Sequence, residues 1–157
     1  MSKGFKLMRI KNGKLYPLYV LHTKEVPMNV WLPAESGPLN DRGKVKGKME
    51  LAYRPGWHIA GTCPEAPQIT EKRNEMVWVE CEYPTEIDYN EVARRNGTNK
   101  DGKVIAVKAC LKDIPYNGFY YFKTSYKQTE PWIIAGAIKI TRIMSWDEVD
   151  TLRKRTA

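Results

Sequence analysis

The stretch from Met76 to Tyr83 constrains the fold more than any other, because its side chains alternate with the two-residue period of a β-strand. One set is Met76, Trp78, Glu80 and Glu82, and the opposite set is Val77, Val79, Cys81 and Tyr83. In a strand these two sets point to opposite faces of a sheet. The pattern therefore predicts a strand over the whole stretch.

Several other short β-prone runs are separated by turn signals. A turn at residues 11–14 separates a first arm at 8–10 from a second arm at 15–21, and a second hairpin turn is expected at 99–102. Further strands are predicted at 30–32, 57–59, 104–107, 118–123 and 132–143. Gly136 is expected to form a bulge or kink within the last run.

Helical signals are few. A brief helix is predicted from Asn90 to Arg95, ended by Asn96 and Gly97. The tail after Ser145 carries a clearer signal, because Ser145 and Glu148 have the spacing of a capping box and basic residues 153–155 suit the helix C-terminus. The sequence thus predicts a single α+β domain over residues 1–157, with mostly antiparallel sheet, few short helices and a C-terminal helix.

Composition excludes several classes of protein. The chain is 42% hydrophobic and 28% charged, which is typical of a globular domain, and it has no apolar run of membrane-spanning length. The three cysteines are far apart and form no CxxC pair, so neither a disulfide framework nor a metal site is expected. Phosphate-binding glycine loops and a signal-peptide pattern are absent as well. These features predict a cytoplasmic protein with no membrane association, and they leave its oligomeric state open.

The net charge of +8 indicates an acidic partner, such as nucleic acid or an acidic protein surface. Basic residues alternate at Arg42, Lys44, Lys46 and Lys48. If this segment is extended, all four charges lie on one face and could follow a phosphate backbone. A solvated loop is the alternative interpretation.

The run from Tyr53 to His58 places polar and aromatic groups around a Pro-Gly turn. We interpret it as the wall of a cleft in which Tyr53, Arg54 and Trp57 bind substrate and His58 acts as an acid or base. His22 is the only other histidine, so a metal-independent ribonuclease using His22 and His58 is one hypothesis. Histidines of the surface or core are the alternative.

Four segments resemble a loosely known domain of phage and mobile-element proteins. They are residues 13–20, 51–58, 77–83 and 132–136, and together they span most of the chain. This resemblance implies a phage or prophage origin, hence action in an infected bacterial host, but it implies no defined activity.

The order of elements also resembles the split sheets of ADP-ribosyltransferases, at the level of the fold. In that family an early strand carries a ribose-binding His or Arg, a middle strand lies beside the nicotinamide, and a late strand opens with a catalytic acid. The resemblance implies these roles for His22, for the segment containing His58, and for Glu130, with NAD as substrate. The middle position departs from the family pattern, because it holds Trp57 and His58 where the family has Tyr and a small polar residue.

Three functional hypotheses follow. The first is an ADP-ribosyltransferase-like enzyme that acts on a host or defence factor. The second is a non-catalytic phage accessory protein that binds nucleic acid or inhibits a host defence complex. The third is the ribonuclease.

Overall fold

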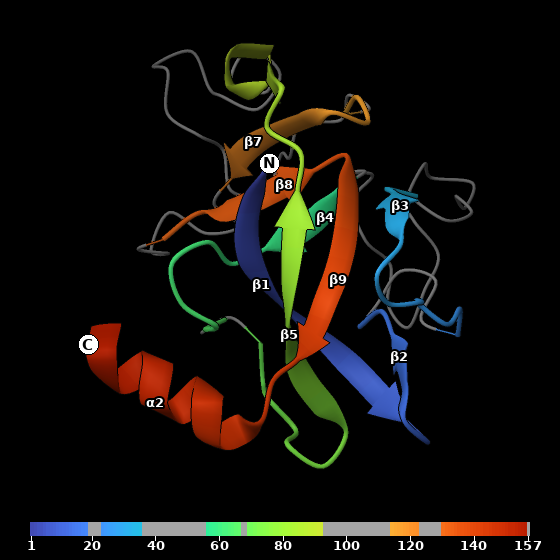
Figure 1. Ribbon diagram of the computed structural model, residues 1–157. Coiled ribbons are helices and arrows are strands. Elements are labelled where there is room, and N and C mark those ends of the chain that lie inside the picture. Colours follow the sequence, from blue (N-terminus) through green and yellow to red (C-terminus); the bar gives the residue numbers. More distant parts are fainter. Residues whose placement is uncertain (19–22, 36–55, 67–68, 93–113, 123–129, 157) are drawn as a thin grey trace, which may run out of the picture.

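The computed structural model describes residues 1–18, 23–35, 56–66, 69–92, 114–122 and 130–156. Its elements, drawn in Figure 1, are mostly antiparallel strands with a helix at the C-terminal end of the described residues. They are β1 (Ser2–Lys11), β2 (Lys14–Tyr16), β3 (Trp31–Pro33), β4 (Trp57–Ile59), β5 (Met76–Tyr83), β6 (Ile87–Asp88), β7 (Gly118–Phe122), β8 (Trp132–Ala135), β9 (Ala137–Ile143) and α2 (Trp146–Thr156). The predicted α+β class with a C-terminal helix is confirmed.

The predicted first hairpin is present, although its two arms differ in length from the prediction. Asn12 and Gly13 both have positive φ angles, 54° and 76°, which is the backbone of a tight hairpin turn. The first arm, β1, begins at Ser2, and the second, β2, ends at Tyr16. The predicted helix from Asn90 to Arg95 extends beyond the described residues, which end at Val92 in this part of the chain. The predicted hairpin at 99–107 lies wholly outside the described ranges.

The strands form two sheets, with orders β2-β1-β5-β9-β3 and β4-β8-β7-β6. Figure 1 shows β1, β5 and β9 side by side, with β4 and β8 passing behind them. The two sheets also meet where Phe5 of β1 bridges to Ala60, the residue after β4, through two backbone hydrogen bonds of 2.7 Å.

Gly136 carries the chain from one sheet to the other. It is the single residue between β8 in the second sheet and β9 in the first. Its amide donates to the Gly118 carbonyl at 3.0 Å, and its own carbonyl accepts from Ala34 at 2.9 Å. A Cβ atom at this position would overlap the Pro115 carbonyl, so the close approach requires glycine. The predicted kink is therefore confirmed.

These connections close a ring of strands, which we call the roll. The ring runs from β1 to β5 to β9, through Gly136 into β8, then to β4 and back to β1. One face of these strands gathers into a single cluster, the roll interior. Its buried members are Met8, Leu15, Val26, Ile59, Val79, Cys81, Tyr83, Ile133, Ala135, Ile138 and Ile140.

The opposite face of the same strands forms a second cluster, the helix-side core. It holds Leu7, Trp78, Trp132 and Ile134 together with Val149 from α2. The alternation predicted for β5 is confirmed here, because Trp78 lies in the helix-side core while Val79 lies in the roll interior. β1, β5 and β8 thus contribute alternate residues to two different cores.

The predicted capping box begins α2. Glu148 donates its backbone N–H to the Ser145 hydroxyl at 3.1 Å, and the Glu148 carboxylate accepts from the Ser145 amide at 3.2 Å. Arg142 also contacts this carboxylate. The Arg142 cation is the larger cause that lowers the pKa of Glu148, and the hydrogen bond from the Ser145 amide is the next largest. Acidic residues in the first turn and basic residues in the last turn complement the helix dipole.

Candidate functional site

Trp57 and His58 enter the structure through Gly56, whose φ angle of 140° lies in the region that side chains rarely adopt. A Cβ atom on Gly56 would overlap the Ile134 side chain of β8. The backbone at Gly56, just before β4, therefore lies too close to β8 for any side chain. Of the residues in the predicted turn, Tyr53, Arg54 and Pro55 lie outside the described ranges.

Trp57 joins the ends of two strands. Its indole Nε1 donates to the Leu32 carbonyl of β3 at 3.1 Å, and its ring packs against the roll interior. The chain between β3 and β4 contains the basic stripe of Arg42, Lys44, Lys46 and Lys48, which lies outside the described residues. This segment therefore leaves and re-enters the described structure at neighbouring points.

His58 is half-buried and lies on the helix-side face of β4. It stands opposite Ile134 in β8, and its ring meets that of Trp132 edge-on, with centroids 6.0 Å apart and planes at 70°. The imidazole therefore contacts the Trp132 ring, and its role as an acid or base stays a prediction.

Lys6 is the residue that the sequence interpretation missed. It lies on β1 opposite Val79, so it shares the face of Met8 and the roll interior. Its Nζ donates to the His58 carbonyl at 3.0 Å and lies 5.6 Å from the centroid of the Trp57 ring. Among the described residues, no carboxylate forms an ion pair with it. The available signal was a cation between Gly4 and Met8 on the face of the strand that also carries Ile10.

Burial sets the protonation chemistry of this cluster. It lowers the pKa of Lys6 to about 8, although the nearby Cys81 thiol acts in the opposite direction. Burial also raises the pKa of Cys81 to about 12, so this thiol stays neutral. The result is an amine that is partly deprotonated near physiological pH beside an unreactive thiol.

The register of β8 does not bring Glu130 beside His58. Glu130 is exposed and lies two residues before β8, whereas the residue opposite His58 is Ile134. Four residues of extended chain span about 13 Å. His22 lies outside the described residues, so the convergence of His22, His58 and Glu130 stays a prediction, as does the pairing of the two histidines.

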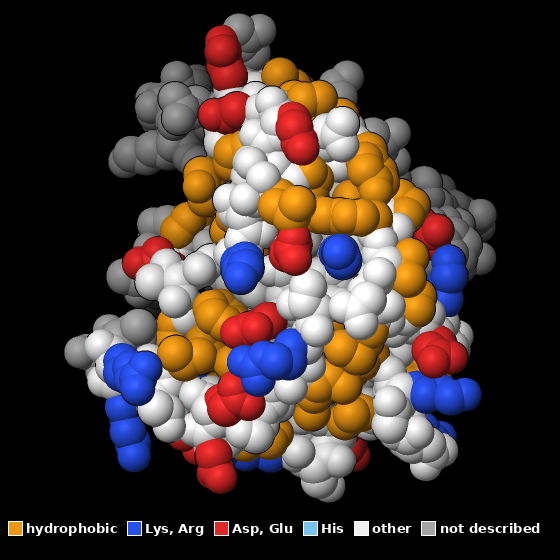
Figure 2. Space-filling view, viewed as in Figure 1, with side chains coloured by type: hydrophobic (Ala, Val, Ile, Leu, Met, Phe, Trp, Pro, Cys, Tyr) orange, Lys and Arg blue, Asp and Glu red, His pale blue; other side chains and the backbone are white. Residues whose placement is uncertain are grey.

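Charge is divided unevenly between the described residues and the rest of the chain. The described residues hold 13 of the 26 Lys and Arg and 14 of the 18 Asp and Glu, a net charge of −1. The remaining segments hold 13 basic and 4 acidic residues, a net charge of +9. Figure 2 shows acidic and basic side chains interspersed over the face that it views.

Another pair of basic segments starts from one place on the second sheet. The Tyr121 amide of β7 donates to the Asn90 side-chain oxygen at 2.7 Å, and Asn90 is held in turn by the Asp88 carboxylate. Soon after these residues the chain enters segments 93–113 and 123–129, which contain eight Lys and Arg. Tyr121 itself is 52% exposed, and its ring meets that of Phe119 edge-on.

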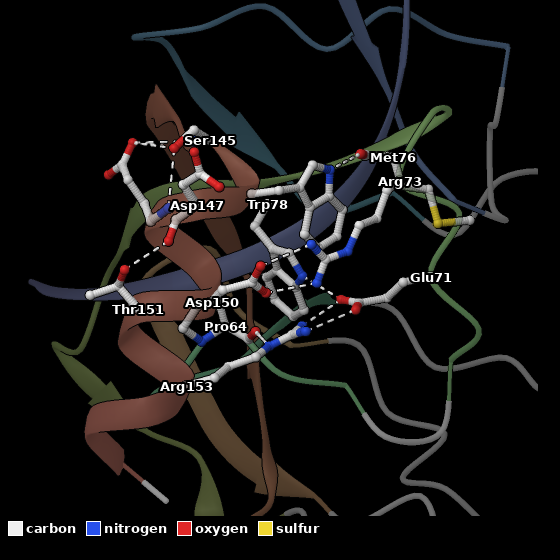
Figure 3. A network of polar contacts seen from close by, with 12 residues as sticks. Pro64, Glu71, Arg73, Met76, Trp78, Ser145, Asp147, Asp150, Thr151 and Arg153 are labelled. Carbon is white, nitrogen blue, oxygen red and sulfur yellow. Dashed lines mark hydrogen bonds and ion pairs between the residues drawn. The ribbon is translucent and has the colours of Figure 1, made fainter.

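A cluster of charged residues at α2 has a structural role (Figure 3). Arg153 donates to both oxygens of Glu71, at 3.0 and 2.6 Å, and to the Pro64 carbonyl at 2.9 Å. The same carboxylate accepts from the indole of the fully buried Trp78 at 2.6 Å. Arg73 pairs with Asp150 and lies 4.4 Å from the Trp146 ring centroid. This network attaches α2 to the helix-side core.

Two further searches concern the described residues. They contain no group of three or more His, Cys, Asp or Glu placed to hold a metal ion. None of their helices combines the length and apolar character needed to cross a membrane.

Comparison with protein-family models, with curated proteins and with solved structures gave no match.

Proposed function

We propose that the protein binds single-stranded nucleic acid through its basic segments, and that the roll with α2 is the framework that presents them. The observation that carries the proposal is the division of charge. Segments 36–55, 93–113 and 123–129 of the sequence together carry a net charge of +9, whereas the rest of the chain carries −1. Such segregation of Lys and Arg is the electrostatic footprint expected of a phosphate-binding protein.

The anchors of these segments support the proposal. The Trp57–Leu32 hydrogen bond joins the two strands that flank the segment containing Arg42, Lys44, Lys46, Lys48 and Arg54. The Asn90–Tyr121 hydrogen bond joins the starting points of the other two basic segments. Both hydrogen bonds therefore bring together described residues that flank the basic segments.

An exposed aromatic ring favours unpaired bases over a duplex. Tyr121 projects from β7 with half of its surface accessible, whereas the adjacent Tyr120 is fully buried. Aromatic rings on strands stack on splayed bases, and each such contact contributes about 1–3 kcal/mol. Acidic Glu86, Asp88 and Glu91 are exposed near this end, so we expect the phosphates to follow the basic segments and to avoid β6.

The test is a salt titration of binding to a fluorescently labelled single-stranded oligonucleotide, measured by anisotropy. The triple variant Lys44→Glu, Lys46→Glu, Lys48→Glu removes positive charges from the stripe. The matched control, Lys11→Glu, Lys72→Glu, Lys154→Glu, changes three exposed framework lysines and gives the same net charge. The slope of log K, the binding constant, against log salt is negative. If three phosphate contacts are lost, this slope should become shallower by about 2 in the stripe variant.

Three outcomes would contradict the proposal. Equal losses of binding affinity in the two variants would indicate a general effect of net charge and no specific contribution from the stripe. Binding that does not change with salt would exclude phosphate contacts. Tighter binding to a duplex than to a single strand would contradict the role given to Tyr121.

A further inference from the structure

The amine of Lys6 differs from the other well-placed cations of the framework. Arg153, Arg142 and Arg73 each contact a carboxylate within 3.1 Å. The contacts of Lys6 are a backbone carbonyl and the face of an indole. A carboxylate partner would hold the amine protonated, and the described residues supply none.

The surroundings of Lys6 favour its neutral form. Val79, Met8 and Cys81 share its face, and Cys81 is the titratable group that acts on it electrostatically. Glu80 and Glu82 belong to the set of β5 side chains on the opposite face, and Glu80 pairs there with Arg142. The side chain of Lys6 nevertheless keeps part of its surface accessible.

We propose that Lys6 is a covalent binding site for a small aromatic aldehyde, held as an imine between the Trp57 ring and the edge of the roll interior. This inference does not depend on nucleic-acid binding. It rests on a half-buried amine without a carboxylate partner and on the aromatic face beside it.

The chemistry needs no further reactant. The lone pair of Nζ attacks the aldehyde carbon, and proton transfer gives a carbinolamine. Loss of the hydroxyl as water then leaves a C=N bond, so one amine and one aldehyde yield one imine and one water. Only the neutral amine is nucleophilic, and the pKa of Lys6 near 8 supplies that form at neutral pH. The Trp57 ring would stack on the aromatic ring of the aldehyde.

The experiment uses the full chain with 4-carboxybenzaldehyde, borohydride trapping and peptide mapping by mass spectrometry. At pH 7.5 we expect Lys6 to be labelled at least about tenfold faster than exposed Lys11 in the same molecule, because a pKa of about 8 leaves a substantial fraction of Lys6 neutral. Labelling of Lys6 should level off above about pH 8. Propanal should show a smaller preference for Lys6, and Trp57→Leu should reduce the preference for the aromatic aldehyde.

Comparing two lysines within one wild-type protein makes the result independent of whether a variant folds. Lys6→Met adds a second check, since it should remove the fastest-labelled site and leave the labelling of Lys11 unchanged. Labelling of Lys6 no faster than that of Lys11 would overturn the proposal. Equal preference for propanal and the aromatic aldehyde would overturn the role given to Trp57.

Discussion

The two cores of the molecule differ in how they accommodate partly buried charged side chains. On the helix side, Arg153 is 23% exposed and Glu71 is 18% exposed, and the pair is completed by the Trp78 indole and the Pro64 carbonyl. At the roll interior, Lys6 has a carbonyl and a ring for neighbours. A charge paired with a carboxylate is typical of a structural contact, whereas an amine for which the described residues supply no carboxylate remains available for chemistry.

The largest expected effect lies at the junction of the two cores. Gly136→Ala would place a methyl group on the Pro115 carbonyl, and we expect it to lower the free energy of unfolding by about 3–5 kcal/mol. Gly13→Ala is the control, because its Cβ would meet nothing within 4 Å and only its positive φ is unfavourable, at about 1 kcal/mol. Urea denaturation followed by circular dichroism measures both. Equal effects would mean that the close approach at Gly136 is not required.

Breaking the helix-side pair should have the next largest effect. Glu71→Gln keeps an acceptor for the Trp78 indole but leaves the Arg153 cation without its carboxylate, so we expect a loss of about 2 kcal/mol. Asp150→Asn removes the carboxylate from the exposed Arg73 pair and should cost clearly less. A greater loss of stability in Asp150→Asn, measured by the same denaturation, would reverse our assignment of the main anchor.

For Lys6 the prediction concerns pH. Its folded pKa of about 8 lies below the unfolded value of 10.5, so the unfolded state binds more protons and the stability of the wild type rises with pH between these values. Relative to Lys6→Met, the wild type should therefore gain about 2 kcal/mol from pH 7 to pH 10. Urea titrations at both pH values test this. If the difference in stability between wild type and Lys6→Met does not vary with pH, the Lys6 amine is exposed to solvent and its pKa is not lowered.

Ser145→Ala should have the smallest effect, a loss of about 1 kcal/mol, because the Glu148 amide loses its hydroxyl acceptor at the start of α2. Thr151→Ala is the matched control in the middle of the helix, where the hydroxyl only donates to the Asp147 carbonyl. Helical circular dichroism during thermal unfolding compares the two. A larger loss for Thr151→Ala would show that the cap does not control this helix.

Local sequence signals predicted the elements that are determined locally. The alternation of β5, the Asn12–Gly13 turn and the Ser145–Glu148 box each act within a few residues, and each is present. The first half of β1 was missed because Lys3, Gly4 and Lys6 interrupt its apolar pattern. That half forms a strand because it pairs with β5, more than 70 residues away in sequence.

The candidate site was less predictable for the same reason. Trp57 and His58 were singled out from composition around a turn, but their partner Lys6 is 52 residues from His58 along the chain. Chain order suggested that His58 and Glu130 could act together, whereas strand register determines which residues face each other. Register depends on long-range pairing that no local pattern encodes.

The passage of one continuous segment through both sheets at Gly136 has a consequence for how the molecule comes apart. Residues 132–143 supply walls to the roll interior and to the helix-side core alike. Neither half can melt while the other keeps its shape, so heating should give one sharp calorimetric transition whose enthalpy matches the van't Hoff value.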